Sequence, residues 1–183
     1  MQSIIFDQQK GKIMSIKMSV LLFILMTSFA AHAEEKEIEV LFTSKTLTPE
    51  AALMVSQAAL KSCRQSGFQV SVVVVDSGGN LQVLLRDRLA GISSPDAAIL
   101  KAKTAINFRS ATTALSEAVN SNSEASGIKQ LPGILVLGGG ITIQASGSMV
   151  GAVGVAGAPD GKADEKCALA GVNVIQELLE FAD

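Results

Sequence analysis

Short apolar runs separated by tight turns constrain the fold of this chain most strongly. Residues 70–75 form a β-branched run, and the turn-forming segment 76–80 separates it from an alternating run at 81–86, which is typical of a β-hairpin. Strands joined by such short turns must be antiparallel, because a parallel connection needs a dozen or more residues. Further strands are expected at 134–137, 141–145 and 149–156, with a hairpin turn at 146–148.

Helical patterns flank these runs. Thr48 can cap a helix that starts with Pro49 and extends to about Ser66, and Ser94 can cap a second helix that ends near Ser110. A shorter helix is expected at 114–119, and a final helix at 160–181. The predicted fold class is therefore α/β, of the α+β kind, with a five-stranded antiparallel sheet covered by helices.

The N-terminal segment is typical of an export signal. An uncharged apolar run at 20–29 follows three lysines and precedes the small-residue site Ala31-His32-Ala33. The run is shorter than the roughly 20 residues that a membrane-spanning helix needs. A buried helix and a retained membrane anchor remain the alternatives, and the true start is Met1, Met14 or Met18.

The predicted organisation is a signal peptide at 1–33, an N-terminal lead-in at 34–46 and one domain at 47–183. Removal of 33 residues from 183 leaves a mature chain of 150 residues, which we expect to be periplasmic or secreted. Once the signal is removed, no membrane partner is expected.

The mature chain would contain no imidazole, phenol or indole. The chain has one His, which is His32 in the signal, and it has neither Tyr nor Trp. These absences exclude Ser-His-Asp and Cys-His hydrolysis and His-rich zinc sites, so no metal site and no catalytic residues are predicted. A net charge of −2 gives no basic footprint for nucleic acid. Only Asp, Glu, Lys and Cys remain for acid–base work.

Two groups of charged residues could bind an anion. The ends of the first hairpin carry Asp76, Arg86, Asp87 and Arg88, which form either a solvated surface or an anion-binding rim. Lys101 shares a helix face with alanines, so we expect its stem to be half-buried. Its ammonium group either extends to solvent or binds the carboxylate of a ligand.

Glycines and cysteines add further constraints. Gly138-Gly139-Gly140 precedes a β-branched run and lacks the following Lys of a phosphate-binding loop, so it predicts a sharp bend or a close backbone approach. Cys63 and Cys167 fall on the apolar faces of the first and last helices. They form either a disulfide, which an oxidising compartment favours, or two buried free thiols.

Taken in order, several segments resemble the GlcG/HbpS-like (DUF336) family. The resemblance covers about residues 47–179 and implies a profilin-like domain with a five-stranded antiparallel sheet, often assembled into homo-oligomers. It also implies haem binding and sensing in some members and a link to glycolate use in others, while most members have no assigned reaction. The segments that carry the resemblance are 73–81, Ser94 with 98–105, Phe108, 131–133, 139–141, 150–157 and 164–171.

The chain departs from the family pattern in two ways. Where many members have Gly-Gly-x-Pro, this chain has Gly139-Gly140-Ile141-Thr142 and lacks the Pro. No His contact to haem can be carried over to the mature chain. Haem remains a possible cofactor, and an iron ligand would have to be Met54, Met149, Cys63, Cys167, Thr112 or Thr113, or be absent.

The sequence favours an exported binding or sensing protein for haem or another small, anionic ligand, rather than an enzyme. The expected ligand-binding residues are Asp76, Arg88, Lys101, Phe108, Gly139 and Gly140. One alternative is a small enzyme acting on a short organic acid such as glycolate, with Lys101 or Asp76 as base. The other is a purely structural homo-oligomer that pairs or packs through 150–157.

Overall fold

The computed structural model describes residues 38–181 and divides the chain into two units, Met1–Phe42 and Thr43–Asp183. The predicted signal peptide lies outside the described residues. In the first unit, residues 38–42 form no helix or strand and are exposed. All helices and strands of the described residues belong to the second unit. Among the described residues, no helix is both long and apolar enough to span a bilayer.

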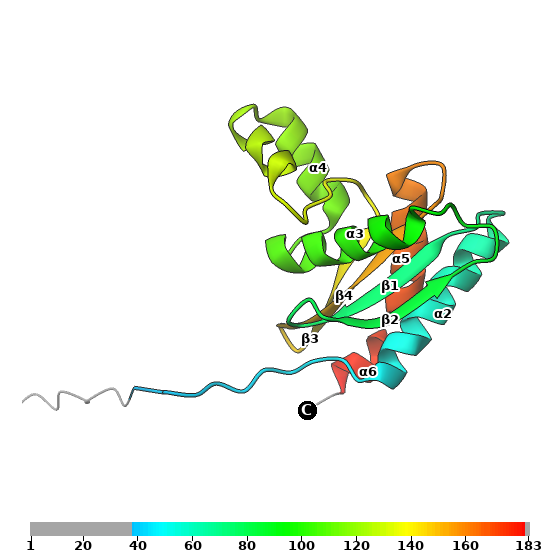
Figure 1. Cartoon of the computed structure of the whole chain (residues 1–183). Coiled ribbons are helices and arrows are strands. Elements are labelled where there is room, and N and C mark those ends of the chain that lie inside the picture. The colour runs from blue at the N-terminus through cyan, green and yellow to red at the C-terminus, as the bar shows by residue number, and fades with distance from the viewer. Residues whose placement is uncertain (1–37, 182–183) are drawn as a thin grey trace, which may run out of the picture. The chain divides into compact units, whose positions relative to one another are not determined.

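An antiparallel sheet of four strands forms the centre of the second unit (Figure 1). The central strands are β1 (Ser71–Asp76) and β4 (Ser148–Ala156), which pair from Ser71 opposite Ala156 to Asp76 opposite Gly151. The edge strands are β2 (Leu81–Arg86) beside β1 and β3 (Gly140–Ala145) beside β4. The antiparallel prediction is confirmed, but the predicted number of five strands is wrong.

The segment 134–137 is the predicted strand that does not form. Pro132 and Gly133 precede it and Gly138 and Gly139 follow it, so the chain turns at both ends. Its backbone bonds to a helix rather than to the sheet, because the Leu135 N–H donates to the Thr104 hydroxyl at 2.9 Å. An apolar run of four residues between such turns can satisfy its backbone in either way.

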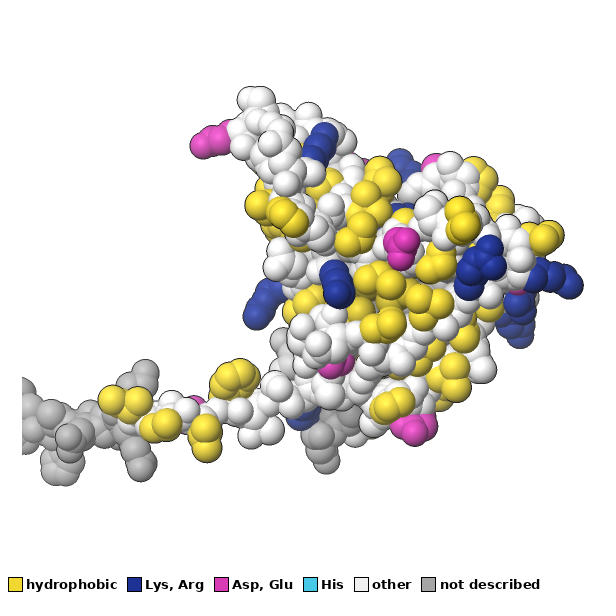
Figure 2. All heavy atoms as spheres, in the orientation of Figure 1, with side chains coloured by type: hydrophobic (Ala, Val, Ile, Leu, Met, Phe, Trp, Pro, Cys, Tyr) yellow, Lys and Arg dark blue, Asp and Glu magenta, His cyan; other side chains and the backbone are white. Residues whose placement is uncertain are grey.

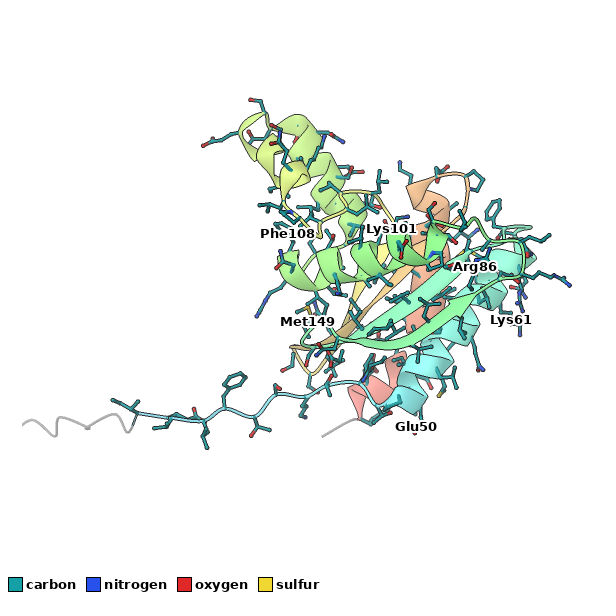
Figure 3. The ribbon with its side chains drawn as sticks, in the orientation of Figure 1. Glu50, Lys61, Arg86, Lys101, Phe108 and Met149 are labelled. Carbon is teal, nitrogen blue, oxygen red and sulfur yellow. A yellow bond between two sulfur atoms is a disulfide. The ribbon has the colours of Figure 1, made fainter. Side chains whose placement is uncertain are left out.

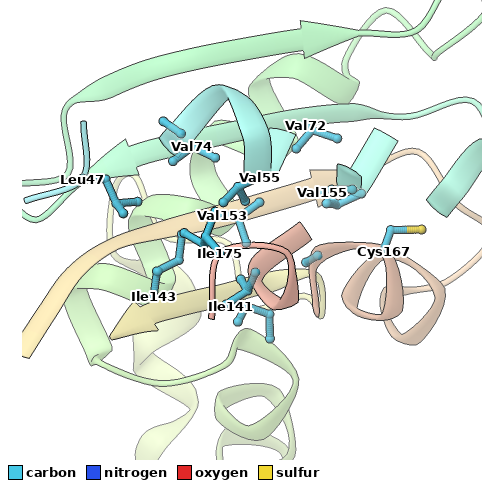
Figure 4. Close-up of a cluster of buried hydrophobic side chains, with 14 of the residues drawn as sticks. Leu47, Val55, Val72, Val74, Ile141, Ile143, Val153, Val155, Cys167 and Ile175 are labelled. Atoms are coloured by element: carbon cyan, nitrogen blue, oxygen red, sulfur yellow. The ribbon is translucent and has the colours of Figure 1, made fainter. Parts of the chain in front are cut away.

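Helices cover both faces of the sheet (Figure 1). The first face carries α2 (Pro49–Gln65), α5 (Gly161–Asn173) and α6 (Gln176–Glu180). The main core lies there, between these helices and side chains such as Val72, Val74, Val153 and Val155 (Figure 4). A smaller core on the other face packs α3 (Ser94–Phe108) on Val73 and Val75 through alanines.

Helix ends follow the predicted patterns in part. Thr48 caps α2, since its hydroxyl accepts the Ala51 N–H at 3.2 Å. The N-cap of α3 is Ser93, not Ser94, because the Ser94 hydroxyl is buried and bonds the Gly91 carbonyl at 2.7 Å. The expected helix 160–181 breaks into α5 and α6, and the break buries Ile175.

A short arm consists of α4 (Thr112–Ser121) and the 3₁₀ helix η1 (Glu124–Gln130), which stands away from the sheet in Figure 1. Helix α4 buries only Thr112 and Val119, and η1 buries no residue. The arm therefore adds little to either core.

Of the two cysteine alternatives, the structure has the disulfide. Cys63 of α2 and Cys167 of α5 are joined, with Cα atoms 5.4 Å apart across 104 residues of sequence. Both residues are buried, at 0% and 2% exposed. The bond therefore links the two main helices of the first face.

Candidate functional site

A buried ion pair connects α3 to the start of α5. The Lys101 ammonium lies 2.6 Å from an Asp164 carboxylate oxygen, and the two residues are 4% and 3% exposed. Lys101 Nζ also donates to the Val155 carbonyl of β4 at 3.0 Å. Figure 3 labels Lys101 on α3, and the bond to Val155 places its side chain between this helix and the sheet. The half-buried lysine that the sequence predicts is thus fully buried.

The Asp164 carboxylate also holds the loop between β4 and α5. Its second oxygen accepts the Ala158 N–H at 3.0 Å. Burial raises the pKa of Asp164 above its ordinary value, and the hydrogen bond and positive charge of Lys101 oppose this shift only in part. A charge pair removed from water is expensive and adds little net stability, so we take the pair as a candidate functional site.

Two glycines allow the backbone to approach this pair. A Cβ at Gly139 would lie 2.6 Å from the Val155 oxygen and 3.0 Å from Lys101 Nζ, and the φ angle of Gly139 is +117°. Gly140 begins β3 directly beside the Lys101 backbone, and its N–H donates to the buried Thr112 hydroxyl at 2.8 Å. The close approach predicted for the glycine triplet is present at these residues.

A cavity of about 440 Å³ lies over the ion pair. Its polar lining comes from Lys101 and Asp164 and from the first residues of α3 and α5, and its apolar lining includes Ala97 and Leu137. The positive ends of two helix dipoles therefore face the same space as the lysine ammonium group. The lining residues at these helix starts are Ser93 and Ser94 for α3 and Asp160 and Gly161 for α5.

Three of the six predicted ligand-binding residues come together, namely Lys101, Gly139 and Gly140. Of the six, only Lys101 lines the cavity. Arg88 is exposed in the loop between β2 and α3, and Phe108 ends α3 seven residues beyond Lys101, about 10 Å along the helix.

Asp76 closes the β1–β2 turn. One of its carboxylate oxygens accepts the N–H groups of Gly78 at 2.9 Å and Asn80 at 2.8 Å. Burial acts to raise the pKa of Asp76, but the hydrogen bonds from Asn80 and the turn outweigh burial and lower it. The carboxylate shapes the turn and is poorly suited to act as a base.

The sequence did not identify Asp164 as a site residue. The available signal was its place in the first turn of the last helix, inside a segment that resembles the family, but its partner lies 63 residues earlier. The sequence alone does not show that two residues so far apart along the chain are in contact.

The candidate iron ligands are not gathered at the cavity. Cys63 and Cys167 are joined to each other, and Thr112 accepts the Gly140 N–H. Thr113 lines a different hollow of about 520 Å³ beside α5 and donates to Glu165, and Met54 is 44% exposed on α2. The described part of the chain contains no cluster of three or more His, Cys, Asp or Glu that could hold a metal ion.

The antiparallel sheet covered by helices agrees with the family that the sequence resembles. The chain belongs to the HbpS-like family, whose model, described as haem degrading protein HbpS-like, matches residues 47–173. The predicted family is confirmed.

Individual relatives with solved structures share the fold. A double mutant of HbpS from Streptomyces reticuli is 41% identical, with a TM-score of 0.70 over 74% of this chain and 90% of that chain. The ORFY protein of Klebsiella pneumoniae is 27% identical, with a TM-score of 0.71 over 74% and 94%. PduOC, solved as a haem complex, is 26% identical, with a TM-score of 0.67 over 72% and 96%.

Proposed function

We propose that this chain is an exported binding protein for a small carboxylate-bearing ligand, which it holds in the Lys101 cavity. Haem or another tetrapyrrole is the ligand class that the family favours, because a relative is solved as a haem complex. The observation that carries the proposal is the buried Lys101–Asp164 pair beneath a cavity of about 440 Å³.

The hydrogen-bonding capacity of Lys101 supports an anionic ligand. A lysine ammonium group has three N–H donors, and here two of them point to Asp164 and to the Val155 carbonyl. The third donor has no partner among the described residues. A ligand carboxylate entering the cavity would meet this donor and the N-terminal end of α3, which has no side-chain cap. The N-terminal end of α5 is already capped by the Asp160 carboxylate, which accepts the Ala163 N–H at 2.8 Å.

The cavity fits the acid groups of haem better than its iron. Its lining offers one lysine for a propionate, and Leu137 and Ala97 for the ring, but it contains no His, Met or Cys. We therefore expect any haem to be held by its carboxylates and by apolar contact, without a soft protein ligand on the metal. Bound haem would supply its own iron chemistry, and the chain's residues would supply orientation and charge neutralisation.

The buried disulfide supports export. Disulfides form and persist mainly in oxidising compartments, and the Cys63–Cys167 bond lies inside the core. Together with the apolar run at 20–29, it favours a periplasmic or secreted protein. Assembly into a homo-oligomer remains part of the proposal.

The enzyme alternative finds less support in the site. Asp76 lies in the β1–β2 turn with a lowered pKa, so it is a poor base. Lys101 would be left as the one proposed base, and it is held in an ion pair with Asp164. Binding without a reaction is therefore preferred.

Titration with haemin and with iron-free protoporphyrin tests the proposal. The chain from Glu34 on is suitable, because the compact unit Thr43–Asp183 contains every described helix and strand. Carboxylate-based binding predicts similar affinities for the two compounds, measured by the Soret band and by porphyrin fluorescence. If haemin binds more than tenfold more tightly than the iron-free ring, an iron ligand is present and this mode of binding is wrong.

A pair of variants on one helix localises the site. Lys101→Met combined with Asp164→Asn removes both buried charges, and we expect affinity to fall at least tenfold, because hydrogen bonds to charged groups contribute about 1.5–3 kcal/mol. The matched control is Lys103→Met on the exposed side of α3, which should leave affinity unchanged. Equal binding by the wild type and the double variant would remove the cavity from the proposal.

A further inference from the structure

One end of the second unit exposes apolar and basic side chains together. The loop between β2 and α3 carries Leu89 and Ile92, whose residues are 77% and 94% exposed. The cations Arg86 and Arg88 in the same region are exposed as well. Lys61 and Arg64 add two more from the last turns of α2, and Figure 2 shows Lys and Arg gathered at the end where Figure 3 labels Arg86 and Lys61. We call this surface the basic tip: Lys61, Arg64, Arg86, Arg88, Leu89 and Ile92.

Internal bonds hold the loop in a fixed form. Asp87 is 2% exposed and takes two hydrogen bonds from the Arg64 guanidinium, at 2.7 and 2.9 Å. The Asp87 N–H donates to the Val70 carbonyl at 2.9 Å, and the Arg86 guanidinium donates to the Ala90 carbonyl. Leu89 and Ile92 are therefore exposed on an ordered loop, which Asp87 bonds to Val70 just before β1 and to Arg64 of α2.

The charge of the basic tip determines which partner suits it. Four cations stand against Asp87, whose charge Arg64 already neutralises. The exposed acids nearby are Asp96 in the first turn of α3 and Asp160, which lines one cavity with Gly91 and Ser93. A second copy that docked by the same surface would set these cations against each other. The partner must therefore be anionic and must also accept two aliphatic side chains.

We propose that the basic tip binds the surface of an anionic lipid bilayer, with Leu89 and Ile92 inserted among the headgroups. Protein interfaces bury about 800 Å² on each partner, whereas this loop presents two protruding side chains surrounded by cations. Binding at a membrane interface grows with the apolar area that is buried and with electrostatic attraction to anionic lipids, and the basic tip offers both. Each cation near an anionic surface strengthens binding roughly fivefold. This inference departs from the sequence-based expectation of no membrane partner, and it is independent of the cavity ligand.

Co-sedimentation with vesicles tests the proposal. The chain from Glu34 on, which excludes the apolar run of the predicted signal, is mixed with phosphatidylcholine vesicles that contain or lack half phosphatidylglycerol. We expect sedimentation with the anionic vesicles at 50 mM NaCl and a loss of at least tenfold at 500 mM, where screening is stronger. If the protein does not sediment with the anionic vesicles at low salt, the proposal is wrong, and an acidic protein becomes the expected partner of the basic tip.

Matched variants separate insertion from charge. Leu89→Ser with Ile92→Ser should reduce binding at least tenfold, and the control Leu178→Ser, an exposed apolar residue of α6, should not. Lys61→Ser with Arg88→Ser should weaken binding about 25-fold, against Lys103→Ser with Lys129→Ser as control. All substituted side chains are exposed, so the thermal unfolding midpoint followed by circular dichroism should stay the same. Binding that depends on charge but not on Leu89 and Ile92 would contradict insertion.

Discussion

The Lys101–Asp164 pair joins two side chains that solvent scarcely reaches. Desolvation of both charges is costly. The two groups stay charged in the interior only because each is paired with the other. The sequence alone indicated Lys101, Gly139 and Gly140 as site residues, because each of them lies among small residues along the chain. Asp164 could not, because an acidic residue in the first turn of a helix is ordinarily explained by the helix dipole alone.

The pair gives a prediction on stability. Lys101→Met should lower the free energy of unfolding by about 3–5 kcal/mol, because it leaves the Asp164 carboxylate buried without its cation. The combined variant Lys101→Met with Asp164→Asn should recover much of this loss. Urea unfolding followed by far-ultraviolet circular dichroism is the suitable measurement, since the chain has no Trp or Tyr. Losses in the single variants that simply add up in the double variant would contradict coupling.

At the scale of elements, the close approach of α3 to the sheet depends on small residues. A Cβ at Gly154 of β4 would lie 2.7 Å from the Ala102 nitrogen and still closer to the Ala98 carbonyl oxygen. The helix contributes Ala98, Ala102 and Ala105 to this contact. The sequence predicts such packing from the alanine spacing, but it does not show which strand glycine the helix covers.

Gly154→Ala therefore tests the packing of α3. We expect a loss of more than about 3 kcal/mol in the free energy of unfolding, because the helix backbone cannot yield as a flexible side chain can. The control is Gly91→Ala, where an added Cβ has no neighbour within 4 Å and the stability should change little. A Gly154→Ala protein as stable as the control would show that α3 can shift freely over β4.

The predicted elements differ from the structure where local signals compete. The hairpin turn was predictable because Ser146 and Gly147 form a two-residue connection, and their φ angles are +47° and +78°. The segment 134–137 was not predictable, because an apolar run of this length suits both a strand and a covering loop. The end of α5 was also missed, because helical spacing along 160–181 favours Val174 and Leu178, whereas the structure buries Ile175 and Leu179.

At the scale of the whole molecule, the disulfide joins α2, the first helix of the second unit, to the middle of α5. It closes most of this unit into one loop, and restricting so long a loop in the unfolded chain favours the folded state. The sequence left the pairing open because a helical stripe identifies the buried face but not the helix opposite it.

Replacing both cysteines measures this contribution. Cys63→Ala with Cys167→Ala should lower the free energy of unfolding by about 2–5 kcal/mol, measured by urea titration without reductant. Reductant added to the folded wild type should change little, because both sulfur-bearing residues are buried. Rapid reduction under native conditions would contradict the burial, and an unchanged stability of the double variant would contradict the entropic account.

The α4–η1 arm determines where this molecule tolerates change in length. With only Thr112 and Val119 buried, the arm can gain or lose residues beyond its first turn while the disulfide and both cores stay intact. The exceptions are the first turn, where Thr112 accepts the Gly140 N–H and Thr113 donates to Glu165, and the buried Val119. A reporter domain placed by design is therefore best accommodated near residues 122–123, which are exposed.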